Sequence, residues 1–209
     1  MRLLLATLGS RGDVEPFLWL ARAARAAGHE VRVALPEAAD VDTTGLDAVS
    51  LGISFADLAD SLDGGAAALR AFRERIRPAM TRALAAAAEV AVEWRPDAIV
   101  AHPKVLTAPV AAARLGVPWF VGELTPTLTP TGEFPAAGVA ARSLGPWLNR
   151  LTFRAVGLAG AMFAGDVTAA RRRHGVSGRL PAPDRLTADR VAAGRDPGGV
   201  QPDAGAAAC

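Results

Sequence analysis

The stretch MRLLLATLGSRGDVEP, residues 1–16, decides the fold. Its residues 3–8 are almost all apolar, which is typical of a strand buried on both faces of a parallel sheet. The loop of residues 9–13 follows, contains two glycines and ends at an aspartate. A helix is expected to begin near Glu15-Pro16, because proline is tolerated in a first helical turn and acidic residues there complement the helix dipole.

Strands and helices alternate along the rest of the chain. The expected strands are residues 31–35, 48–51, 97–101 and 119–122, and the further expected helices are residues 66–94, 106–115 and 146–174, with Pro78 bending or dividing the first of them. This alternation predicts an α/β protein whose doubly wound, Rossmann-like sheet is mostly parallel. Residues 1–175 form the predicted domain, and residues 176–209, which lack a hydrophobic period, are predicted to be a low-order tail.

The composition is that of a globular protein. Hydrophobic residues make up 51% and charged residues 21% of the 209 residues, and the net charge of +2 does not favour nucleic-acid binding. Lys104 is the only lysine among many arginines, which suggests a GC-rich bacterial genome. Cys209 is the only cysteine, so no intrachain disulfide and no cysteine-ligated metal is expected, and the cytoplasm is the natural compartment. No apolar run reaches the ~20 residues of a spanning helix, although peripheral contact of residues 142–173 with a membrane is an open alternative.

The loop of residues 9–13 is the first candidate site. In open α/β sheets the ligand crevice lies at the carboxyl ends of the strands, and this loop follows the first strand. Asp13 should therefore lie within reach of the crevice, either as a catalytic carboxylate or merely as the N-cap of the following helix. The glycine spacing matches neither the dinucleotide-binding fingerprint nor the phosphate-binding P-loop.

His102 is the second candidate. It follows the strand expected at residues 97–101 and should open on the same crevice as Asp13. We expect the two side chains to interact through substrate or water, and a separation beyond ~10 Å would exclude the pairing. The alternative is that His102 only satisfies backbone groups of its own loop.

The opening stretch closely resembles the start of the glycosyltransferase family 28 N-terminal domain, as found in sterol-glucosyltransferase-like and antibiotic glycosyltransferases. Further segments are similar to the same group: AGHEV at residues 27–31, AHP at 101–103, LGVP at 115–118, and parts of residues 125–135. The resemblance covers residues 1–175. It implies the N-terminal, acceptor-side half of a two-domain GT-B fold.

The resemblance also implies an activity. Enzymes of this type transfer a hexose, with inversion, from a nucleotide sugar to a hydroxyl group of a lipid, sterol or natural product, and they need no metal or further cofactor. By resemblance Asp13 is the general base, while Ser10, Arg11 and Gly12 shape the first loop and approach the diphosphate of a UDP- or dTDP-sugar. Thr125 and Phe134 come from the loop that contributes to the acceptor site. The remaining aromatic and large apolar side chains are either ordinary core or the lining of an apolar acceptor pocket: Trp119, Phe120, Trp147, Leu148, Phe153 and Phe163.

The donor half of such an enzyme is expected to lie outside this sequence. In GT-B enzymes a Gly- and His-containing signature of the C-terminal domain holds the nucleotide sugar, and no such signature is seen in residues 1–209. We therefore expect the chain alone to be inactive, with a separate polypeptide supplying the donor domain, or with residues 176–209 marking a truncated or frameshifted gene. The alternative function is a non-catalytic protein that binds the acceptor or assists a transferase.

Overall fold

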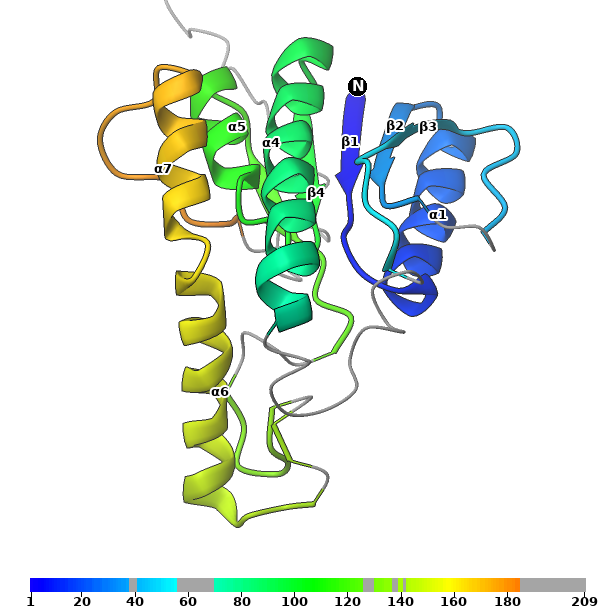
Figure 1. Ribbon diagram of the computed structural model, residues 1–209. Coiled ribbons are helices and arrows are strands. Elements are labelled where there is room, and N and C mark those ends of the chain that lie inside the picture. The colour runs from blue at the N-terminus through cyan, green and yellow to red at the C-terminus, as the bar shows by residue number, and fades with distance from the viewer. Residues whose placement is uncertain (38–40, 56–69, 126–129, 137–138, 141, 185–209) are drawn as a thin grey trace, which may run out of the picture.

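The structure is a computed structural model that describes residues 1–37, 41–55, 70–125, 130–136, 139–140 and 142–184. The strands are β1 (Arg2–Ala6), β2 (Glu30–Leu35), β3 (Asp47–Ser50), β4 (Ala98–Ala101) and β5 (Trp119–Val121). The helices are α1 (Arg11–Ala26), the short π-helix η1 (Phe72–Ile76), α4 (Arg77–Trp94), α5 (Ala108–Leu115), α6 (Pro146–Ala161) and α7 (Ala164–Arg173). Figure 1 shows α1 on one side of the sheet and α4 and α5 on the other, with α6 extending beyond the end at which the strands terminate.

The sheet confirms the α/β prediction. Its five strands have the order β3-β2-β1-β4-β5, and every neighbouring pair is parallel. From β1 the chain moves outward through β2 and β3, and it then crosses back to place β4 on the other side of β1. The strand order therefore reverses between β1 and β4, which is the point where open α/β sheets bind their ligands.

The two faces of the sheet carry two separate apolar clusters. Successive side chains of a strand point to opposite faces, so Leu5 of β1 packs with Val14 and Phe17 of α1. Its neighbour Leu4 joins the cluster formed with α4 and α5, to which many alanines contribute. Because these alanines are small, the backbones of α4 and α5 approach closely, and both helices cover the same face.

Helix α1 begins four residues earlier than the sequence indicates. Its first residue is Arg11, and Pro16 lies inside the helix rather than at its start. The reason is local: Ser10 is the N-cap, and the Asp13 carboxylate accepts its backbone N–H, so the helix can begin in the loop itself. The alternative that Asp13 is the N-cap is not realised, because Ser10 holds that position, although the Asp13 carboxylate does help to cap the helix.

Two later helices also differ from the prediction. The first expected helix contains a π-helical stretch: η1 passes directly into α4 without a break, and Pro78 stands in the first turn of α4; residues 56–69 lie outside the described residues. The single helix expected at residues 146–174 is two helices, α6 and α7, separated at Met162 and Phe163. Phe163, in the turn between the two helices, packs against the core, and its ring centroid lies 4.7 Å from the guanidinium carbon of Arg77.

Part of the predicted tail is ordered against the sheet. The Trp119 indole N–H donates to Pro181 O at 3.1 Å, and Asp184 N donates to Trp119 O at 2.8 Å. Pro181 and Asp184 therefore contact β5, and the assignment of residues 176–209 to a separate tail stays a prediction. Residues 185–209 lie outside the described part of the chain. Among the described residues, no helix has both the length and the apolar composition needed to cross a bilayer.

Candidate functional site

The candidate site lies where the sheet changes direction. Asp13 follows β1 and His102 follows β4, and these strands are direct neighbours in the sheet. His102 Nε2 lies 3.3 Å from Asp13 Oδ1. The structure therefore brings the two predicted residues together. Their contact is direct, whereas the sequence led us to expect substrate or water between them.

The two oxygens of the Asp13 carboxylate have different surroundings. Oδ2 accepts the Ser10 backbone N–H at 2.9 Å, lies 3.5 Å from Ser10 Oγ, and lies 2.9 Å from the Lys104 ammonium. Oδ1 is contacted by His102 Nε2. Asp13 thus caps its own helix with one oxygen, and the less engaged oxygen, Oδ1, faces the histidine.

His102 is held by its own loop as well as by Asp13. Its side chain is buried, its Nδ1 accepts the Lys104 backbone N–H at 3.2 Å, and its ring meets the Phe17 ring edge-on. Because Nδ1 accepts a hydrogen bond, the ring hydrogen is on Nε2, and this N–H donates a hydrogen bond to Asp13 Oδ1. His102 therefore contacts Asp13 with one ring nitrogen and the backbone of its own loop with the other.

Lys104 is the member of this site that the sequence interpretation missed. Its ammonium completes a triad with Asp13 and His102, and the side chain is half exposed. The available signal was that the only lysine of the chain stands two residues after His102, at the end of a central strand. Nothing in the local sequence pattern, however, shows that a long side chain leaving β4 reaches back to the loop after β1.

The pKa of Asp13 reflects two opposing influences. Partial burial of the carboxyl acts to raise its pKa, but the hydrogen bonds and charges of His102 and Lys104 outweigh burial and hold the pKa well below its ordinary range. Asp13 is therefore an anion at any physiological pH. The carboxylate, paired with the Lys104 ammonium, lies at the edge of the sheet where a ligand would enter.

Gly9 is fitted to the Asp13 side chain. Its φ of +147° lies in a region that other residues rarely adopt, and a Cβ placed on it would overlap Asp13 Oδ2. The first glycine of the loop therefore makes room for the carboxylate, whereas the sequence suggested only general backbone freedom for it.

The other predicted site residues lie around the triad with different contacts. Ser10 touches Asp13 directly, and Gly12 lies in the first turn of α1. The Arg11 side chain points along its own helix and pairs with Glu15 at 2.6 Å, so in this structure it does not engage the carboxylate. Thr125 and Phe134 are exposed in the segments that follow β5. Their roles, and those of Ser10, Arg11 and Gly12, stay predictions.

The aromatic side chains divide between core and surface. Phe153 is buried and Phe163 packs against the core, as the core alternative predicts. Trp147 and Leu148 are exposed on α6, so they are not core residues.

Comparison with known proteins agrees with this geometry. The model of the glycosyltransferase family 28 N-terminal domain matches residues 3–127, more than half of the chain. The chain belongs to this family. The matched residues include all three members of the triad, and the fold is that of the N-terminal half of GT-B glycosyltransferases.

Individual relatives of this family 28 domain are longer proteins. The chain is 33% identical over 166 residues to an O-mycaminosyltylonolide 6-deoxyallosyltransferase of Streptomyces fradiae. This alignment covers 73% of the chain and 38% of that relative. The chain is also 30% identical over 148 residues to a sterol 3-beta-glucosyltransferase of Arabidopsis thaliana, covering 65% of the chain and 24% of that relative. The glycosyltransferase SnogD of Streptomyces nogalater is a similar solved structure, with a TM-score of 0.51 and 28% identity over 90% of the chain and 44% of SnogD. The chain thus spans less than half the length of each of these relatives.

The Lys104→Met variant of the family 28 domain is expected to have a higher Asp13 pKa. The substitution removes both the hydrogen bond of the ammonium to Asp13 Oδ2 and its positive charge. The ionised carboxylate is then less stabilised relative to the protonated carboxyl, so the pKa rises. Carboxyl ¹³C shifts of labelled aspartate, followed against pH, measure the change. Arg114→Met is the matched control, because it removes an exposed positive charge of α5. If Asp13 titrated identically in the two variants, the contact between the Lys104 ammonium and Asp13 Oδ2 would be contradicted.

Proposed function

We propose that this chain is the acceptor-side half of an inverting hexosyltransferase in which Asp13 is the general base. The observation that carries the proposal is the Asp13 carboxylate, oriented by His102 and Lys104 at the strand-order reversal, with Oδ1 the less engaged oxygen. Membership of the family 28 domain supports sugar transfer as the type of reaction.

In the proposed step an acceptor hydroxyl binds at Asp13 Oδ1. Its oxygen attacks the anomeric carbon of a nucleotide sugar from the face opposite the leaving group, and a new carbon–oxygen bond forms. The bond between the anomeric carbon and the diphosphate oxygen breaks, and its electron pair leaves with the nucleoside diphosphate. The hydroxyl proton passes to Asp13, so the anomeric configuration is inverted and the charges balance.

The low pKa of Asp13 determines the timing of this proton transfer. An ion-paired carboxylate is a weak base and removes little of the proton from a free alcohol. As the new carbon–oxygen bond forms, the attacking oxygen gains positive charge and its proton becomes strongly acidic. The proposed transfer therefore accompanies bond formation. His102 serves as a positioning residue, since its N–H fixes the carboxylate that receives the proton.

The relatives suggest the classes of donor and acceptor. Two of the relatives named above are an O-mycaminosyltylonolide 6-deoxyallosyltransferase and a sterol 3-beta-glucosyltransferase, and a further relative with 35% identity is an L-demethylnoviosyl transferase of Streptomyces niveus. We propose a hydroxyl on a large and mostly apolar acceptor, with a UDP- or dTDP-linked hexose as donor. The donor would be held chiefly by a C-terminal half, a proposal supported by the match to an N-terminal domain and to only 38% of the Streptomyces fradiae relative.

The experiment that tests this function compares the chain alone with the chain joined to the donor half of the Streptomyces fradiae relative. Each is incubated with several UDP- and dTDP-sugars and a panel of apolar acceptors, and the anomeric configuration of any product is determined by NMR. The proposal predicts an inverted product from the joined protein and none from the chain alone. A retained configuration would contradict the mechanism, and acceptor binding without any transfer would favour the non-catalytic accessory protein.

A further inference from the structure

Thr7 carries a buried hydroxyl group that has no part in the reaction proposed above. The residue directly follows β1 and is fully buried. Its Oγ1 donates a hydrogen bond to the main-chain O of Asp13 at 2.9 Å. A buried hydroxyl group is unfavourable unless it has a hydrogen-bond partner, and Thr7 finds that partner in the candidate site. Thr7 thus holds the backbone of Asp13, whereas the other members of the triad contact its carboxylate.

The end of β1 is connected to both loops of the candidate site. Ala6 O accepts the backbone N–H of His102 at 2.8 Å, and the next residue, Thr7, binds Asp13 O through its hydroxyl. The Thr7 backbone N–H donates to Ala34 O of β2 at 2.9 Å, which fixes Thr7 itself relative to the sheet. Because Asp13 and His102 are tied to two consecutive residues, the separation of their backbones is set there. The 3.3 Å contact between their side chains depends on that separation.

The first turns of α1 have a particular need for this hydroxyl. Pro16 lies inside the helix and has no N–H, so it cannot donate the usual helical hydrogen bond to the carbonyl of Gly12, four positions earlier. Asp13 is the residue after Gly12, and the Thr7 hydroxyl supplies a donor to its carbonyl. The bond from Thr7 therefore supports the helix next to the position where proline removes a hydrogen bond.

We propose that Thr7 is a positioning residue, whose hydroxyl fixes the start of α1 so that the Asp13 carboxylate meets His102. Because Thr7 is fully buried, it acts only through Asp13. Its effect on turnover rests on the proposed function, but its effect on the contact between Asp13 and His102 does not. In Thr7→Val the shape of the side chain is nearly kept and the hydroxyl is lost. The carboxylate should then move away from His102.

The test on the whole chain is NMR of the His102 ring. The hydrogen on Nε2 donates to Asp13 Oδ1 in a buried place, so we expect a downfield signal from it in the parent chain. Labelling of histidine with ¹⁵N, together with the absence of the signal in His102→Gln, assigns it. In Thr7→Val we expect the signal to move upfield and its hydrogen to exchange with water at least about tenfold faster, because the contact opens more often.

Thr107→Val is the matched control for Thr7→Val. Thr107 is also fully buried, and its hydroxyl donates to a main-chain carbonyl of a helix, Leu84 O of α4, at 2.7 Å. The substitution therefore removes the same kind of hydrogen bond but leaves the one from Thr7 in place. Both variants should lower the thermal midpoint by similar amounts. Only Thr7→Val should change the His102 signal.

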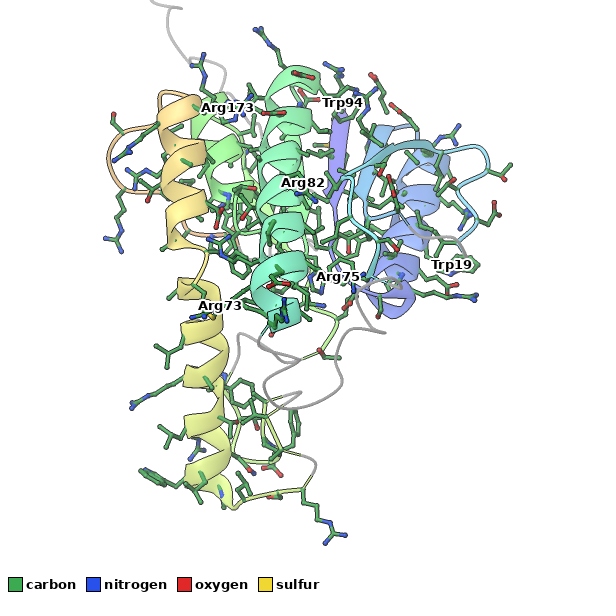
Figure 2. The ribbon with its side chains drawn as sticks, in the orientation of Figure 1. Trp19, Arg73, Arg75, Arg82, Trp94 and Arg173 are labelled. Atoms are coloured by element: carbon green, nitrogen blue, oxygen red, sulfur yellow. The ribbon has the colours of Figure 1, made fainter. Side chains whose placement is uncertain are left out.

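A second pair of variants covers the case in which Thr7→Val does not fold. Thr7→Ser keeps the hydroxyl and Thr7→Ala removes it, while both lose the same methyl group. Only Thr7→Ser should keep the His102 signal of the parent chain. Folding of each variant is checked by the indole N–H signal of Trp94, which contacts Arg2 where β1 begins. Figure 2 shows Trp94 at the upper end of α4, away from α6, and its signal should be the same in every variant.

Turnover of the chain joined to the donor half gives the second measurement. Thr7→Val should lower kcat about 10–100-fold with little change in KM, because a displaced carboxylate impairs catalysis more than acceptor binding. Thr7→Ser should recover most of the kcat that Thr7→Ala loses. Thr107→Val should stay within about twofold of the parent, since its hydrogen bond does not reach Asp13.

Four results would overturn the proposal. The parent chain could lack the His102 signal, Thr7→Val could keep it unchanged, or Thr107→Val could alter it as much as Thr7→Val does. The fourth result is an equal kcat for the parent and Thr7→Val. If no form of the joined protein transferred sugar, the proposed function would fail, and the NMR comparison would still decide whether Thr7 positions Asp13.

Discussion

Asp13→Asn is expected to lower the kcat of sugar transfer by about 10²–10⁴-fold, because the amide cannot accept the proton of the acceptor hydroxyl. The measurement is turnover by the chain joined to a donor half, at saturating acceptor and donor. Acceptor affinity should change much less, since the amide keeps the shape of the carboxyl group. A loss in kcat with little change in KM would show an interaction made mainly in the transition state.

The control for this variant is Glu15→Gln. Glu15 is an exposed carboxylate of the same helix, pairs with Arg11 and does not belong to the triad. The same change from acid to amide there should leave turnover within about twofold, because surface ion pairs contribute little. If Asp13→Asn retained full activity, Asp13 would be only a capping residue of α1.

Gly9→Ala is expected to have the largest effect on the fold. A Cβ at this position would overlap Asp13 Oδ2 and lie 2.7 Å from Asp13 Cβ, and the φ of +147° is already unfavourable for alanine. The backbone conformation alone should cost about 1–3 kcal/mol, and displacement of the carboxylate adds to it. Chemical denaturation measures the loss in the free energy of unfolding, and turnover should fall as well because the triad is disturbed.

Two comparisons separate the steric and backbone parts of this loss. Gly28 also has a positive φ, +84°, but a Cβ there has no neighbour within 4 Å, so Gly28→Ala should show the backbone cost alone. In an Asp13→Gly background the overlap is gone, and Gly9→Ala should then cost clearly less than in the parent chain. Equal costs in both backgrounds would mean that Gly9 is not fitted to the Asp13 side chain.

Much of the fold could be predicted because apolar runs and glycines identify it locally. The opening strand has apolar side chains on both faces, as a central strand of a parallel sheet requires. In the structure it is β1, the middle strand of the sheet. The approximate location of the site followed from topology: side chains that come directly after neighbouring parallel strands meet at one edge. Asp13 and His102 are expected at the same edge for this reason, and His102 Nε2 lies 3.3 Å from Asp13 Oδ1.

What the sequence did not predict depends on contacts between distant segments. Phe163, in the turn between α6 and α7, contacts Arg77, and Pro181 and Asp184 contact β5. The reach of Lys104 to Asp13 spans 91 positions of the sequence. The start of α1 was missed for a local reason, since a carboxylate at the third helical position can cap a helix as well as a residue at its start.

The most direct test of the central claim is a crystal structure of the chain joined to a donor half, with acceptor and nucleoside diphosphate bound. We expect the reacting hydroxyl oxygen to lie about 2.6–3.2 Å from Asp13 Oδ1, while His102 Nε2 still donates to the same carboxylate. A reacting hydroxyl more than about 5 Å from Asp13, and within hydrogen-bond distance of a different base, would contradict it.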